Sequence, residues 1–237
     1  MGKVNEKHAQ KERVILAGKR TMTTRKRAAL HNLGCKVNAY ETDAMQELLE
    51  HAGYEIVAFT DVADVYVINT CSVTNMADRK SRQMIHRAKK KNPHAIVVAA
   101  GCYVQTSTEE VLADLAVDIV IGNNQKNHLV ERIAEFEAKN PINLAEGAEK
   151  SADAGAVEEK VVDCVDINQD GQDYEYFLVN KTAEHTRAFI KVQDGCNQFC
   201  SYCIIPYARG RVRSRAIEDV VKEVEGLAKS GYREVVL

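Results

Sequence analysis

Short runs of β-branched and small apolar residues alternate with amphipathic segments from Arg27 to about residue 136, and this alternation limits the fold more than any other feature. The apolar runs cover 28–33, 54–59, 65–69, 95–100 and 117–121. Helix candidates begin at Asn38, which has capping-box spacing to Glu41, and cover about 75–91, 106–115 and 125–139. Strands separated by helices pair in parallel. The pattern therefore predicts an α/β fold whose N-terminal domain, residues 27–139, is a Rossmann-like doubly wound sheet.

The character of the chain changes on both sides of this domain. Residues 1–26 form a basic extension without apolar periodicity, which we expect to be disordered, with Met22 a candidate native start. Residues 140–184 are acidic and polar, and we interpret them as a linker in which 161–165 could pair with 174–178 as a hairpin. Residues 185–237 predict a strand, a cysteine-rich loop, a helix over about 216–230 and a last strand over 234–237, which is one βα unit and the opening of the next.

Charge is segregated along the chain although the formal net charge of the 237 residues is only -2. The first 27 residues sum to +7, residues 137–186 to -8, and residues 187–215 to +5. Four bases of the last segment are Arg209, Arg211, Arg213 and Arg215. A basic patch next to acidic stretches indicates an anionic partner at that patch. No apolar run is long enough for a membrane span or a signal peptide, so we expect a cytoplasmic protein without a membrane partner.

Three of the seven cysteines form a compact group, Cys196, Cys200 and Cys203, in a C-x3-C-x2-C arrangement directly after a predicted strand. An odd cysteine count favours metal binding or catalysis over a disulfide framework. Three thiolates within eight residues suit a [4Fe-4S] cluster with one iron left open for another molecule. The alternative is a structural zinc loop that borrows Cys164 or His185 as its fourth ligand.

Another three cysteines, Cys35, Cys71 and Cys102, are dispersed but share one context, because each directly follows a predicted strand. Residues just past the carboxyl ends of parallel strands lie along one edge of the sheet, where such folds bind ligands. All three precede helix candidates, whose N-terminal ends favour thiolate over thiol. We therefore expect the three thiols to converge on a second iron–sulfur cluster. Cys164 is expected to have no special role.

These residues together resemble the radical S-adenosylmethionine (SAM) tRNA methylthiotransferases. The compact group, with aromatic Tyr202 before its last cysteine, looks like the radical-SAM cluster motif, and the dispersed group looks like the cysteines of the family's N-terminal domain. Residues 206–215 look like the arginine-rich stretch that follows in the family. Residues 34–38 and 69–74 look closest to the type that acts on N6-threonylcarbamoyladenosine in tRNA.

The resemblance implies a fold in which residues 185–237 begin a radical-SAM (βα) partial barrel. It also implies two [4Fe-4S] clusters, SAM, a tRNA substrate and an electron donor such as flavodoxin or ferredoxin. The SAM-derived radical would remove hydrogen from C2 of the modified adenine, and a methylated sulfur delivered at the dispersed cysteines would replace it. Tyr202 would pack near the adenosyl group, and the four arginines would meet phosphate or the substrate carboxylate.

Several residues near the dispersed cysteines keep two interpretations. Asn38, Asn69 and Thr74 could donate hydrogen bonds to cluster sulfurs or cap the helices that follow, and His31 is expected to be a core residue. Three readings of function also stay open: the enzyme named above, a methylthiotransferase for isopentenyladenosine in tRNA or for a ribosomal protein, and a non-catalytic zinc-stabilised nucleic-acid-binding module. Because the family's barrel repeats its βα unit about six times, we expect this chain to be a fragment that binds iron–sulfur but has weak or no turnover alone.

Overall fold

The computed structural model describes residues 25–141, 159–177, 179 and 187–237. Its centre is a six-stranded sheet in the order β2-β1-β3-β4-β5-β6, in which every pairing is parallel. The strands are β1 (Arg27–Asn32), β2 (Glu55–Ile56), β3 (Val65–Thr70), β4 (Ile96–Gly101), β5 (Ile119–Ile121) and β6 (Val161–Asp163). All residues of β3 and β4 are buried, as expected for central strands covered on both faces.

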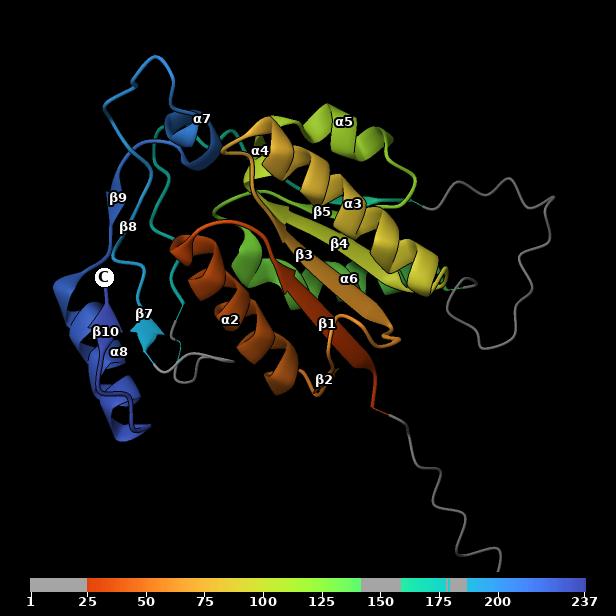
Figure 1. Cartoon of the computed structure of the whole chain (residues 1–237), viewed down its shortest axis with the longest axis horizontal. Coiled ribbons are helices and arrows are strands. Elements are labelled where there is room, and N and C mark those ends of the chain that lie inside the picture. The colour runs from red at the N-terminus through yellow and green to blue at the C-terminus, as the bar shows by residue number, and fades with distance from the viewer. Residues whose placement is uncertain (1–24, 142–158, 178, 180–186) are drawn as a thin grey trace, which may run out of the picture.

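Helices cover both faces of this sheet, as Figure 1 shows. One core contains Met45 and Leu49 of α2 (Lys36–His51) and Ile133 of α6 (Leu129–Lys139), which follows a short 3-10 turn, η1 (Lys126–His128). The opposite core contains Ile85 and Tyr103, from the second group of helices. That group is α3 (Asn75–Lys91), α4 (Cys102–Thr106) and α5 (Thr108–Ala113). The predicted α/β, doubly wound fold is confirmed.

Helix α2 starts earlier than the capping-box spacing predicted. Cys35 is its N-cap, in an extended conformation and without a side-chain hydrogen bond. Asn38 and Glu41 therefore lie inside the helix, where both are buried. Their side chains make long-range contacts instead of capping α2, so the capping-box interpretation is wrong.

The predicted linker is partly built into the sheet. β6 pairs in parallel with β5, from Ile119↔Val161 to Ile121↔Asp163. The proposed hairpin is not formed, because 161–163 already pairs with β5 and residues 172–177 contain no strand. Residues 1–24, which hold nearly all of the basic extension, and residues 142–158 lie outside the described residues.

Residues 187–237 form a second, smaller unit. β7 (Ala188–Phe189) pairs in parallel with β10 (Val235–Val236), and α8 (Ile217–Lys229) connects them. Ala188, Ile190 and Leu227 form its core. β8 (Gln193–Asp194) and β9 (Arg213–Ser214) form an antiparallel pair that brackets the cysteine loop and the short helix α7 (Ile205–Arg209). This is the predicted βα unit followed by the next strand.

The second unit packs against α2 of the first. Tyr40 and Ala44 of α2 form a buried apolar cluster with Phe177 and Val179, and Phe189 of β7 packs against it. The Tyr40 hydroxyl also lies 3.3 Å from both the Phe177 carbonyl oxygen and Glu223 Oε2. Among the described helices, none is both long and apolar enough to cross a bilayer.

Candidate metal centre

The dispersed cysteines lie at one edge of the sheet. Cys35 follows β1, Cys71 follows β3 and Cys102 follows β4, at the carboxyl ends of three neighbouring parallel strands. Cys71 and Cys102 are buried, whereas Cys35 is exposed. One edge of the fold thus presents three thiols, one of them open to solvent.

Glycine at position 34 allows the first two cysteine segments to approach closely. Gly34 has φ +112°, and a Cβ placed on it would lie 2.8 Å from both Cβ and Sγ of Cys71. A side chain at position 34 would therefore collide with the Cys71 thiol. The direct contact shows that the loop leading into Cys35 passes against Cys71.

The thiols also interact electrostatically. Burial raises the pKa of the Cys71 thiol, a hydrogen bond with the Val73 backbone opposes this, and the thiols of Cys102 and Cys35 raise the pKa further. The pKa of the Cys71 thiol is therefore raised from its usual value, whereas the sequence predicted a preference for thiolate.

Two buried asparagines hold the cysteine edge in place. Asn38 Nδ2 donates to the carbonyl oxygens of Leu33 (2.7 Å) and Thr70 (2.9 Å), which ties the ends of β1 and β3 to α2. The Cys35 Sγ lies 3.8 Å from Asn38 Oδ1. Asn123, after β5, donates from Nδ2 to Cys102 Sγ at 3.5 Å. The interpretation of Asn38 as a neighbour of the site is thus supported by a direct contact to a cysteine.

The compact cysteines lie on the loop between β8 and α7. The Cys196 N–H donates to the Gly210 carbonyl oxygen (3.0 Å), and the Cys203 N–H donates to that of Cys200 (2.9 Å), so the loop closes on itself. Phe199, within the loop, has φ +46°. Cys200 is exposed and the other two thiols are partly exposed, so the loop presents its sulfur atoms to solvent.

A second glycine fixes the base of this loop. Gly195 has φ +73°, and a Cβ there would lie 2.2 Å from the Arg211 carbonyl oxygen and 2.4 Å from that of Gly210. Only glycine permits this approach of two backbone segments. Gly195 therefore allows a close approach directly before Cys196, as Gly34 does directly before Cys35.

The two cysteine groups belong to adjoining structures. Helix α7, which directly follows the compact cysteines, packs on α4, which begins at Cys102; Figure 1 shows the two helices next to each other. Asn123 Nδ2 donates both to Cys102 Sγ and to the Ala208 carbonyl oxygen of α7 (2.6 Å). Arg209, at the end of α7, interacts electrostatically with Cys71 and Cys102.

A buried ionic network joins the two units behind the cysteines. Glu41 of α2 is fully buried and contacts Lys126 (2.8 Å), Lys191 (2.9 Å) and Arg209 (2.8 Å). Burial opposes the charged form of Glu41, but three cations, led by Arg209, outweigh it and hold the pKa of the carboxyl well below its usual range. Asp194 of β8 completes the network through Lys191 and Arg209, which likewise lower its pKa against the effect of burial.

Three of the four predicted partner-binding arginines are engaged inside the chain. Besides its carboxylate partners, Arg209 Nη2 donates to Asn38 Oδ1 (2.7 Å). Arg213 donates to the Arg209 carbonyl oxygen (2.9 Å), and Arg215 forms an ion pair with buried Glu223. Arg211 differs, because it is exposed and stacks over the Phe199 ring. Contact with an anionic partner remains a prediction, best suited to Arg211.

The other predicted residues are placed as follows. Tyr202, on the loop of the compact cysteines, is 90% exposed. The Thr74 side chain caps α3 by accepting a hydrogen bond from the Ala77 N–H, as the capping interpretation expected. Asn69 Nδ2 donates to the Asn38 carbonyl oxygen inside α2 (2.9 Å). The His31 ring lies against Phe59, and burial lowers its pKa, as does Arg87. The half-buried Cys164 thiol is near Thr108.

Sequence reasoning missed the acidic and basic residues of the buried network. Glu41, Lys126, Lys191 and Asp194 come from α2, η1 and the segment 190–194. The partners of Glu41 lie far from it in the sequence, whereas Lys191 and Asp194 are only three positions apart. One signal was present: Lys191 interrupts the apolar run Ala188-Phe-Ile-Lys-Val192. A charge inside a buried strand requires a partner of opposite charge.

The cysteines fit iron–sulfur clusters by the chemistry of their thiols. His185, one of the two alternative ligands of a zinc loop, lies outside the described residues. Within the described ranges no three His, Cys, Asp or Glu side chains are arranged to share one metal ion. A [4Fe-4S] cluster binds cysteine thiolates on its separate iron atoms. Three thiols at one sheet edge next to the Arg209 guanidinium suit a group whose thiolate ligands carry negative charge.

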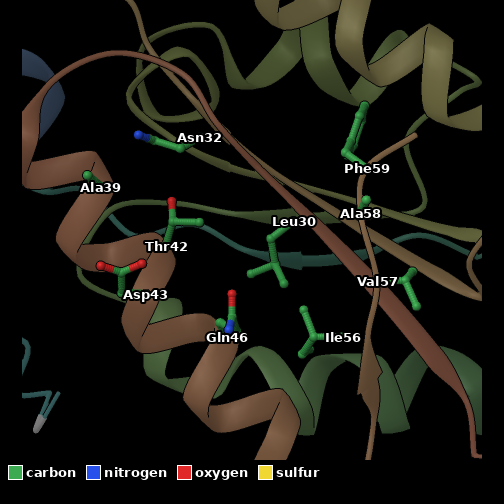
Figure 2. Close-up of a pocket in the computed structure, with 10 residues that line it drawn as sticks. All are labelled: Leu30, Asn32, Ala39, Thr42, Asp43, Gln46, Ile56, Val57, Ala58 and Phe59. Atoms are coloured by element: carbon green, nitrogen blue, oxygen red, sulfur yellow. The ribbon is translucent and has the colours of Figure 1, made fainter. Parts of the chain in front are cut away.

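A separate pocket of about 580 Å³ lies at the outer edge of β1. β1 pairs with β2 only at Arg27↔Glu55 and Ala28↔Ile56, and the chain then diverges. Figure 2 shows the opening between β1, α2 and residues 56–59, with Thr42, Asp43 and Phe59 at its walls. The pocket contains no cysteine and none of the predicted site residues.

Comparison with known proteins matches both parts of the chain. Residues 27–122 match the family model described as uncharacterized protein family UPF0004, and residues 190–237 match the Radical SAM superfamily. The threonylcarbamoyladenosine tRNA methylthiotransferase MtaB of Bacillus subtilis is 43% identical over 88% of this chain, and that of Aquifex aeolicus is 44% identical over 89%. Over both matched segments the chain is similar to radical SAM methylthiotransferases.

The chain is also similar to methylthiotransferases that are named for a different modified adenosine. The tRNA-2-methylthio-N(6)-dimethylallyladenosine synthase of Bacteroides fragilis is 28% identical over 92% of the chain. The chain covers 42%, 47% and 44% of these three relatives, so it spans less than half the length of the methylthiotransferases it matches. The Radical SAM match begins at Ile190, two residues after β7 starts, and includes all three compact cysteines.

Proposed function

We propose that this chain holds the two cluster-binding elements of a tRNA methylthiotransferase that converts N6-threonylcarbamoyladenosine to its 2-methylthio derivative. One observation carries the proposal: helix α7, which follows the compact cysteines, packs on helix α4, which begins at a dispersed cysteine. A reaction that combines radical formation with sulfur transfer needs both cysteine groups near one substrate. The 43–44% identity to two threonylcarbamoyladenosine enzymes, against 28% to a dimethylallyladenosine enzyme, favours this substrate.

In the proposed enzyme, Cys196, Cys200 and Cys203 hold the [4Fe-4S] cluster that binds SAM, and Cys35, Cys71 and Cys102 hold the second. When bound, these groups supply the radical and sulfur chemistry that amino-acid side chains cannot perform at an unactivated aromatic C–H bond. The exposed loop at 196–203 leaves its thiols accessible for a cluster and for SAM, with Tyr202 available to cover the adenosyl group.

The protein's own contribution is positioning and electrostatics. Arg209 interacts electrostatically with Cys71 and Cys102, and at Cys71 its positive charge opposes the increase in the thiol pKa that burial causes. Asn38 and Asn123 orient Cys35 and Cys102. Arg211 contacts the RNA in this proposal, and the partners are tRNA and a cytoplasmic electron donor of the flavodoxin or ferredoxin type.

The ligand assignment is tested by anaerobic reconstitution followed by iron and sulfide counts. Two independent clusters predict about eight irons per wild-type chain, and about half that number in each of two variants, Cys196/Cys200/Cys203→Ala and Cys35/Cys71/Cys102→Ala. Cys164→Ala is the matched control and should retain all of the iron. Zinc in place of iron, or iron loss in only one triple variant, contradicts the proposal.

The substrate is tested separately, by mass spectrometry of tRNA nucleosides from cells with and without the gene. Loss of 2-methylthio-N6-threonylcarbamoyladenosine with retention of the dimethylallyl counterpart is expected. The reverse pattern would assign the dimethylallyl substrate.

A further inference from the structure

Helix α3 carries a stripe of basic side chains on its solvent-facing side. Arg79, Lys80, Arg87 and Lys90 are all exposed, and so is Gln83 between them. At 100° per residue these five positions fall within an arc of about 100°, and from position 79 to 90 they extend about 17 Å along the helix. We call Arg79, Lys80, Arg87 and Lys90 the α3 stripe.

The charges of the α3 stripe are not neutralised by the described part of the protein. No ion pair or hydrogen bond joins any of the four side chains to another described residue, whereas bases on the flanks of the same helix are paired. Arg82 pairs with Glu110 (2.9 Å) and Lys89 with Asp118 (2.7 Å). The only acid in α3 is Asp78, so the exposed side of this helix has an uncompensated charge of +4.

Other basic regions of the described structure differ from this one. Three arginines of residues 209–215 are buried with partners of this chain, which removes most of the basic patch that the sequence suggested. On α8, Lys222 and Lys229 alternate with Glu218, Asp219 and Glu225. Within the part of the chain that the structure describes, unpaired positive charge is therefore concentrated on α3.

The α3 stripe is rigidly connected to the cysteine edge. Helix α3 begins four residues after Cys71, and Ser81 on its buried side hydrogen-bonds the Cys71 backbone (Oγ to carbonyl oxygen 3.3 Å, N–H to Oγ 3.4 Å). The Arg79 end of the stripe is nearest to this connection, and the helix runs away from the site toward Lys90. A polyanion lying along α3 would thus reach the Cys71 end of the helix.

We infer that the α3 stripe binds the phosphate backbone of the substrate RNA, next to the nucleotide that enters the cysteine edge. The inference rests on the proposed function, because tRNA is the polyanion that this function supplies. Lys and Arg side chains spaced along a rigid helix neutralise successive phosphates without reading the base sequence. The stripe positions the RNA, and base recognition lies elsewhere.

The test is binding of an anticodon stem-loop RNA to the 237-residue chain, measured by fluorescence anisotropy between roughly 50 and 200 mM salt. The variant Arg79→Gln/Lys80→Gln/Arg87→Gln/Lys90→Gln should bind at least about tenfold more weakly near 100 mM salt, and its salt slope should fall by about one per lost contact. The matched control Arg187→Gln/Lys222→Gln/Lys229→Gln/Arg233→Gln changes net charge equally, on the second unit, and should keep the wild-type slope. Thermal melts confirm that both variants fold.

A second measurement locates the contact on the wild-type chain. Bound RNA should protect Lys80 and Lys90 from acetylation, and leave Lys222 and Lys229 as reactive as in the free chain. Equal loss of binding in both quadruple variants, or unprotected Lys80 and Lys90, would contradict RNA binding by the α3 stripe. Iron binding and the proposed function would not be affected by that result. Absence of RNA binding by the wild-type chain overturns both.

Discussion

The Arg209 Nη1 atom lies 2.8 Å from Oε1 of Glu41, although the two residues are 168 positions apart and both are buried. Glu41 belongs to the N-terminal sheet domain and Arg209 to the helix after the compact cysteines. The ion pair therefore fixes the position of one cysteine group relative to the other. Arg209 also donates to Asn38 Oδ1, which lies beside the Cys35 sulfur. The guanidinium of the second unit therefore contacts a residue next to a cysteine of the first.

Removing the central anion of the network should destabilise the chain strongly. Glu41→Gln removes the carboxylate that pairs with buried Lys126, Lys191 and Arg209, and Asp194 then pairs with Lys191 and Arg209 but not with Lys126. Breaking a buried ion pair by removing one partner typically costs about 3–5 kcal/mol. Urea unfolding should show this decrease in the free energy of unfolding.

The matched control for that substitution is Glu135→Gln. Glu135 forms ion pairs with Arg132 and Lys139 on the partly exposed surface of α6. Surface pairs contribute about 0–1 kcal/mol, so the control should be close to wild type. Equal effects of the two substitutions would show that the buried network does not stabilise the fold.

The same network predicts how stability depends on pH. Its cations hold the pKa values of Glu41 and Asp194 below those of the unfolded chain despite burial. A carboxyl with a lowered folded-state pKa stabilises the protein fully above its unfolded pKa of about 4, and this contribution is lost as pH falls through the folded value. Urea midpoints should fall from about pH 5 to pH 3, and the fall should be shallower in Glu41→Gln. A parallel decline in both proteins would contradict the assignment.

The two arginines nearest the compact cysteines should respond differently to the same conservative change. Arg209→Lys loses the planar guanidinium that contacts Asn38, Glu41 and Asp194 together, and we expect destabilisation by about 1–3 kcal/mol. Arg211→Lys changes an exposed side chain over Phe199 and should cost less than about 0.5 kcal/mol. Thermal melts of the two variants measure the difference. Equal melting temperatures would show that the Arg209 contacts between the two units do not stabilise the protein.

The contrast between these arginines shows what the sequence could predict. Local patterns predicted β1, β3, β4 and α3 nearly to the residue, and the common position of three cysteines after strands predicted their shared sheet edge. The start of α2 was wrong because Cys35 adopts the N-cap conformation without a side-chain hydrogen bond, which no capping motif signals. Strand β6 and the pairing of Arg209 with Glu41 depend on contacts between distant segments, and charge alone placed all four arginines on a surface.

Gly34→Ala should disturb the cysteine edge specifically. An alanine at φ +112° is strained by roughly 1–2 kcal/mol, and its Cβ would also lie 2.8 Å from Cys71 Sγ, so the thiol must move. Gly53→Ala is the matched control, because Gly53 also has a positive φ (+92°) but no atom lies within 4 Å of the added Cβ. Both variants should lose stability, whereas only Gly34→Ala should lose iron from the dispersed cysteines after reconstitution. Full iron content in both would show that the Gly34–Cys71 contact does not shape a cluster site.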